Sequence, residues 1–149
     1  MVQVNAIGLF ALVARLVLAW VFIRAGLPKV QDPVAFAASI DNYRIVEGSL
    51  SLWVALVLPW LEVVIGIGLL TPWLRQASGW AITALLGLFI GLHTSAWARG
   101  LDIDCGCFGE SNETIGYHWL ILRNSLLLLV AIFILLRDSR NKKTPESSI

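Results

Sequence analysis

The chain has 149 residues, of which 58% are hydrophobic and only 14% are charged, and its mean hydropathy is +0.78. A chain of this composition cannot build a water-soluble surface, which excludes a soluble globular domain and favours an integral membrane protein. The net charge of +1 gives no reason to expect a nucleic-acid partner, and the seven tryptophans suit the aromatic belts of membrane proteins.

The first apolar run predicts a transmembrane helix over residues 7–23, interrupted only by Arg15. The predicted end of this helix is the segment 24–29, where glycine and proline break the pattern. No basic region precedes the run, so we expect no cleaved signal peptide and a first helix that stays in the mature protein. Asp32 and Pro33 then predict the start of a short amphipathic helix on the membrane surface.

Three further apolar runs predict transmembrane helices over residues 50–70, 77–98 and 117–136. The last residues combine basic side chains with Ser, Pro and Asn, which predicts a disordered tail. The predicted fold is therefore all-α. It is an integral membrane four-helix bundle over residues 1–136, with a short interfacial helix between helices one and two, followed by a basic cytoplasmic tail over residues 137–149.

The distribution of basic residues predicts the orientation of this bundle. An even number of spans places both termini on one side, and that side carries five basic residues: Arg75, Arg137, Arg140, Lys142 and Lys143. The opposite side carries four, diluted by acidic residues: Arg24, Lys29, Arg44 and Arg99. The positive-inside rule therefore favours cytoplasmic termini in a bacterial inner membrane, with the segment 99–116 on the periplasmic side.

The segment 99–116 contains the only two cysteines, Cys105 and Cys107, separated by one glycine. A disulfide between them would close a very small ring, and the resulting strain would make the bond easy to reduce. Disulfides persist outside the cytoplasm, so thiol–disulfide exchange is the favoured interpretation. The alternatives are an inert structural pair and a metal site assisted by His93 or His118, although two thiols at this spacing fit metal sites poorly.

Two charged residues fall inside the predicted spans. Arg15 is the midpoint of the first span, and Glu62 lies two residues from the midpoint of the second, a difference in depth of about 3 Å. A charge at this depth costs at least about 2.5 kcal/mol, so each should pair, and we predict a salt bridge between Arg15 and Glu62. Such a pair can be purely architectural, or it can serve a proton relay or bind a polar head group.

His93 and Arg123 are predicted at similar depths, in the outer halves of the third and fourth spans beneath the cysteine segment. Both can donate hydrogen bonds to a carbonyl oxygen, so they form a candidate site for a quinone or another small redox partner. A plain interfacial histidine is the alternative for His93.

Several segments together resemble a known family: Arg15-Leu16, Ala25-Gly26-Leu27-Pro28-Lys29, Pro59-Trp60-Leu61-Glu62, Asp104-Cys105-Gly106-Cys107-Phe108-Gly109 and Arg123-Asn124. The chain is similar to the DoxX-like membrane proteins and, more closely, to their MauE branch. The resemblance implies a four-helix bundle linked to redox reactions outside the cytoplasm. For the MauE branch it implies a role in forming or maturing the disulfide-rich small subunit of methylamine dehydrogenase, with a thioredoxin-like partner.

Three functions compete at this point. The first is a membrane protein that exchanges electrons between a periplasmic thioredoxin-like protein and a quinone or another membrane carrier through Cys105 and Cys107. The second is a non-enzymatic assembly or anchor subunit for a soluble redox protein. The third, and least favoured, is a small carrier or channel for a polar solute, suggested only by the charges at mid-membrane.

Overall fold

The chain folds into α-helices, as the composition predicts. The structure, a computed structural model, describes residues 6–101 and 117–142. These residues form five helices: α1 (Ala6–Gln31), α2 (Pro33–Asp41), α3 (Ser49–Leu70), α4 (Arg75–Ala98) and α5 (Tyr117–Lys142). All but α2 are long and apolar enough to cross a membrane, so the chain is a multi-pass membrane protein with four candidate spans among its described residues.

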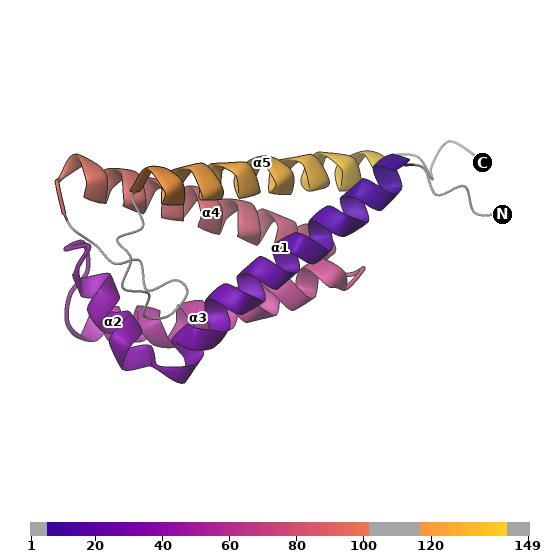
Figure 1. The fold of residues 1–149 in the computed structure, drawn as a ribbon. Helices are drawn as coiled ribbons and strands as arrows, with labels where there is room; N and C mark the ends of the chain where they lie inside the picture. Colours follow the sequence, from indigo (N-terminus) through magenta and orange to yellow (C-terminus); the bar gives the residue numbers. More distant parts are fainter. Residues whose placement is uncertain (1–5, 102–116, 143–149) are drawn as a thin grey trace.

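The helices run back and forth between two ends of the bundle (Figure 1). One end holds the start of α1, the turn between α3 and α4, and the end of α5, and we call it the terminal end. The other, the loop end, holds α2, the end of α4 and the start of α5. The helices α1 and α3 pack closely, as do α4 and α5, and α3 also packs on α4.

Helix α1 continues eight residues past its predicted end, to Gln31. The predicted end at residues 24–29 is wrong because, inside a membrane bundle, a helix is the simplest way to satisfy backbone hydrogen bonds, and glycine and proline are tolerated there. The helix ends only where Asp32 caps the next one: its carboxylate accepts a hydrogen bond from the backbone N–H of Ala35 at 2.9 Å, ahead of Pro33 at the first helical position.

The short helix α2 packs along the first part of α3. Phe36 and Ala37 of α2 are buried against Ala55 of α3. At the end of α2, the hydroxyl of Ser51 donates a hydrogen bond to the carboxylate of Asp41. Both α1 and α2 therefore pack on α3. Figure 1 shows α2 continuing past the end of α1 toward the loop end.

Helix α5 also exceeds its predicted length and runs to Lys142, so the first residues of the predicted tail are helical. Two of them contact α1. Asp138 forms an ion pair with Arg15, and Arg137 donates a hydrogen bond to the backbone carbonyl oxygen of Ile7. These contacts fix the end of α5 to the start of α1, where Figure 1 shows the two helices meeting.

The core and the outer surface are both apolar, as expected for a protein dissolved in lipid. A cluster of buried side chains from α1, α3, α4 and α5 fills the centre, including Leu18, Phe22, Ile65, Leu86 and Ile134. All seven tryptophans are at least half exposed. Trp73 at the terminal end is 95% exposed, which suits an aromatic belt, whereas Trp20 and Trp60 lie near the middle of their helices. The belt prediction therefore fits only part of the tryptophans.

Candidate functional site

A buried ion pair joins α1 to α3 inside the bundle. The ammonium of Lys29 donates hydrogen bonds to both carboxylate oxygens of Glu62, at 3.0 and 2.9 Å. The side chain of Lys29 is 3% exposed and that of Glu62 is 1% exposed. The predicted salt bridge between Arg15 and Glu62 is therefore wrong, because Glu62 pairs with Lys29 and Arg15 pairs with Asp138 at the terminal end.

The extension of α1 explains this exchange of partners. Lys29 was expected in a loop, but the continuous helix carries it alongside α3. In α3, Glu62 lies thirteen residues after Ser49 and eight before Leu70, which is about 20 Å from one end and about 12 Å from the other. The pair therefore lies within the span and not at a surface. Arg15, nine residues from the start of the longer α1, falls in the half near the terminal end.

Close packing of two backbones allows the pair to form. A Cβ atom added to Gly26 would lie 2.8 Å from the carbonyl oxygen of Pro59 and 2.9 Å from Cγ2 of Val63. Only glycine allows α1 to approach α3 so closely at this point. Gly26 precedes Lys29, and Pro59 precedes Glu62, by the same three residues, nearly one turn of helix, so the close approach brings the two charges within hydrogen-bond range.

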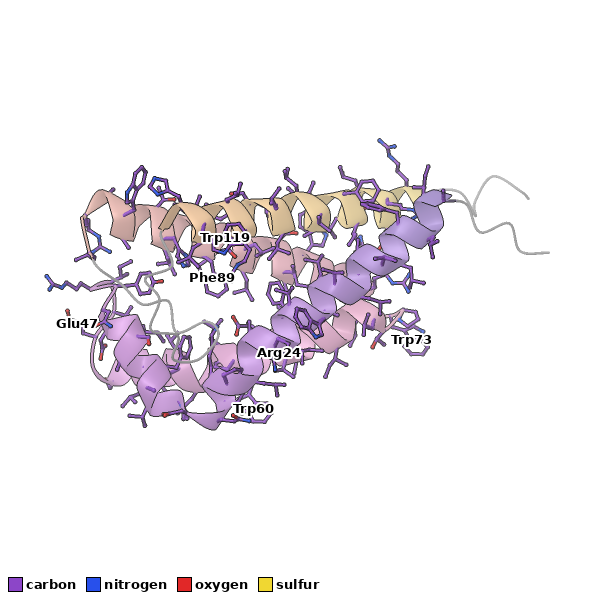
Figure 2. The ribbon with its side chains drawn as sticks, in the orientation of Figure 1. Arg24, Glu47, Trp60, Trp73, Phe89 and Trp119 are labelled. Atoms are coloured by element: carbon purple, nitrogen blue, oxygen red, sulfur yellow. The ribbon has the colours of Figure 1, made fainter. Side chains whose placement is uncertain are left out.

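Aromatic rings surround the ammonium of Lys29. Its nitrogen lies 4.8 Å from the ring centre of Phe36 and 5.6 Å from that of Phe89, so α2 and α4 both contribute. A ring face attracts a cation, and this attraction is stronger where water is excluded. Figure 2 shows Phe89 on α4, at the level where α1 and α3 pass beneath it. Four of the five described helices thus meet at this pair.

A cavity of about 30 Å³ lies beside the pair, between α1, α3, α4 and α5. Six of its nine lining residues are apolar: Val21, Phe22, Ala25, Leu86, Phe89 and Leu127. The other three are Glu62 of α3 and the neighbours Arg123 and Asn124 of α5. Glu62 therefore lines the cavity while both of its carboxylate oxygens accept hydrogen bonds from Lys29, which is not among the lining residues.

His93 belongs to a second polar cluster, nearer the loop end. Its Nδ1 lies 2.5 Å from the carbonyl oxygen of Phe89, so this nitrogen carries the proton and donates. The hydroxyl of Tyr43 is then the donor toward Nε2, at 3.5 Å. The guanidinium of Arg99 donates to the carbonyl oxygen of Tyr43 at 2.6 Å. These contacts hold Tyr43, which follows α2, against the last turns of α4.

The two residues that were predicted to share a quinone site, His93 and Arg123, differ in their relation to the cavity. His93 lies five residues before the end of α4 and Arg123 six residues after the start of α5, about 8 and 9 Å along the helices from these ends. However, Arg123 lines the cavity beside Glu62, and His93 does not. A quinone at these residues stays a prediction.

Cys105 and Cys107 lie outside the described residues, so their redox role stays a prediction. The helix ends on either side of them come together, because the rings of Trp97 and His118 are 5.2 Å apart and packed edge to face. Within residues 6–101 and 117–142, no three His, Cys, Asp or Glu side chains are grouped as metal ligands. Both cysteines were outside that search, so the metal alternative for them is not tested.

Sequence reasoning missed two members of the buried site, Lys29 and Asn124. The signal for Lys29 was its spacing from Gly26, a helical turn that places both residues on one helix face. Asn124 was noted beside Arg123, but as part of a motif and not as a cavity residue. It is 4% exposed.

Comparison with known proteins supports one family. The family model described as methylamine utilisation protein MauE matches residues 7–137. The methylamine utilization protein MauE of Paracoccus denitrificans is 34% identical over 121 residues, which cover 80% of this chain and 65% of that protein. The proteins of the same name from Methylophilus methylotrophus and Methylorubrum extorquens are 37% and 35% identical and are covered over 52% and 58% of their length. The chain thus spans less than two thirds of each of these relatives, and no solved structure matches it.

Proposed function

The chain belongs to the MauE family of methylamine utilisation proteins, and on this premise we propose that it takes part in thiol–disulfide exchange or disulfide maturation of a partner protein outside the cytoplasm. The observation that carries the proposal is the pair Cys105 and Cys107, the only cysteines of the chain, separated by a single glycine. A disulfide in so small a ring would be strained and readily reduced, which suits exchange better than a structural role.

The position of the pair in the chain also supports exchange. The segment that contains both cysteines follows α4 and precedes α5 in the chain, and the described ends of these two helices lie at the loop end. We propose that the termini are cytoplasmic in a bacterial inner membrane and that this segment is periplasmic, where oxidising conditions favour disulfide chemistry. A periplasmic thioredoxin-like protein is the partner that this chemistry requires, and the family name makes methylamine utilisation the candidate pathway.

The exchange itself can be written with its electrons balanced. A thiolate of the pair attacks the disulfide of the partner, a mixed disulfide forms, and one partner thiolate leaves. The second cysteine then attacks the mixed disulfide, so that the pair is oxidised to a disulfide and the partner is reduced to a dithiol. The reverse sequence oxidises the partner and returns the pair to two thiols. In the second direction a quinone would reset the pair by taking two electrons and two protons from the thiols, and in the first a reduced two-electron carrier such as a quinol would supply them to the disulfide.

Trapping the thiols in membranes tests the proposal. Acid quenching followed by alkylation should show a mixture of reduced and oxidised chain that shifts when the partner is removed. Because the chain has only two cysteines, every alkylation signal comes from this pair. The single variants Cys105→Ser and Cys107→Ser should lose partner oxidation, and one of them should accumulate a mixed disulfide. Permanently reduced cysteines, or full activity in both variants, would refute exchange.

The alternative function is a non-enzymatic assembly or anchor subunit. The observation that favours it is the set of four described helices long and apolar enough to cross a membrane, which would anchor the chain in lipid without any chemistry. Under this alternative, the double variant Cys105→Ser with Cys107→Ser would still purify together with the partner and still support its maturation. The exchange proposal predicts that maturation is lost even where co-purification is kept.

A further inference from the structure

The cavity beside Glu62 has a composition that packing alone does not require. Protein interiors are packed to nearly crystalline density, and an ion pair that only ties two helices together needs no open space next to it. Here the described helices leave a space of about 30 Å³ lined in part by Glu62. Three polar residues from two helices line this space, and the remaining lining residues are apolar.

The size and the polar groups of the cavity fit water. By the usual measure, about 10–15 Å³ is needed for each water molecule, together with two to four polar partners, so this cavity has room for about two. The carboxylate of Glu62 can accept hydrogen bonds, the guanidinium of Arg123 can donate them, and the amide of Asn124 can do both. A larger ligand, such as a quinone ring, would need the helices to move apart.

We propose that this cavity holds water and that, with the Lys29–Glu62 pair, it forms a proton-exchange site inside the membrane. Glu62 is the central group because it contacts both the ammonium of Lys29 and the cavity. A proton passes from the nitrogen of Lys29 to an oxygen of Glu62, which converts an ammonium–carboxylate pair into an amine–carboxylic acid pair. Exchange of that acid proton with cavity water completes the step, and no electrons are transferred.

Few charged groups lie near enough to Glu62 to influence the transfer of its proton. From α1, Lys29 contacts the carboxylate, and from α5, Arg123 faces the same cavity. From α4 the cavity receives Leu86 and Phe89, neither of which titrates. Exclusion of bulk water makes the charged and neutral forms of the pair closer in free energy than they are in solution, because the low dielectric removes the hydration that favours charges. This site does not depend on the proposed thiol exchange.

Infrared difference spectroscopy on the full chain in lipid nanodiscs tests the site. Spectra recorded from about pH 4 to about pH 10, in H₂O and in D₂O, should contain a buried carboxylic-acid band that shifts when deuterium replaces the proton. Glu62→Asp should move this band, and Glu62→Gln should remove it. If wild-type protein shows no such band, or shows one that does not exchange, the proposal is wrong.

A second variant separates proton exchange from helix packing. Asn124→Leu keeps the Lys29–Glu62 pair and removes a polar partner of the cavity water, so deuterium uptake at the Glu62 band should slow by about tenfold or more, which corresponds to about 1.4 kcal/mol. The adjacent control Ser125→Ala changes a residue that does not line the cavity and should leave the rate unchanged. Equal rates in wild type and Asn124→Leu would overturn the role of the cavity. A loss of thiol exchange alone would not overturn it, because the proton-exchange site does not depend on the cysteines.

Discussion

The stability of the bundle should depend on the Lys29–Glu62 pair as a unit. Both side chains are at most 3% exposed, and both carboxylate oxygens are bonded to the ammonium. Removing one partner leaves a charge inside the membrane, which costs about 3–5 kcal/mol in buried pairs and at least about 2.5 kcal/mol at bilayer depth. Uptake or release of a proton by the remaining group limits this cost. We therefore expect Lys29→Met and Glu62→Gln each to lower the free energy of unfolding by about 2–4 kcal/mol.

The double variant is the critical comparison. With both charges absent, Lys29→Met combined with Glu62→Gln should be at least about 2 kcal/mol more stable than the sum of the single effects predicts. The measurement is a reversible SDS titration in bicelles followed by circular dichroism at one fixed lipid composition. Strictly additive effects, or single variants that cost less than about 1 kcal/mol, would show that the pair is solvated and would refute the burial argument.

The remaining predictions concern helix packing and capping. Gly26→Ala should lower the free energy of unfolding by about 1–3 kcal/mol, because its Cβ would meet the backbone of α3, whereas Gly87→Ala, with nothing within 4 Å, should be neutral or slightly stabilising in the same SDS titration. Asp138→Asn should cost about 1 kcal/mol, since its pair with Arg15 is partly exposed, and proteolysis should then release the end of α5 more rapidly. Replacement of the helix cap, Asp32→Ala, should cost about 1 kcal/mol by the same titration, and an unchanged midpoint would contradict the capping role.

The number and order of the helices could be predicted from hydropathy because each span is long and apolar. Length and lack of charge identify such a span whatever its neighbours are. The ends of the helices were less predictable. Gly26 and Pro28 end helices in water, but inside a bundle the same residues allow close packing and cost less than leaving backbone groups without partners. The longer α1 follows from this difference, whereas the end of α5 is held to α1 by Asp138 and Arg137.

The ion pairs could be predicted as a type but not in their partners. The cost of a lone charge in lipid correctly implied that Glu62 would be paired. The choice of Arg15 as its partner assumed that both lay at mid-span, an assumption that depended on the predicted end of the first helix. Once α1 extends to Gln31, Lys29 enters the bundle and Arg15 falls nearer the terminal end. The wrong end of the first helix therefore accounts for the wrong partner predicted for both Glu62 and Arg15.

The same correction strengthens the proposed orientation. The positive-inside rule counts basic residues that flank the spans, and a lysine buried in an ion pair no longer flanks one. Without Lys29, the sequence count becomes three basic residues on the loop side, Arg24, Arg44 and Arg99, against five on the side of the termini, Arg75, Arg137, Arg140, Lys142 and Lys143. The bias toward cytoplasmic termini is therefore larger than the sequence count suggested. A membrane-impermeant maleimide applied to intact spheroplasts should label Cys105 or Cys107 when they are reduced, and labelling only after lysis would reverse the proposed orientation.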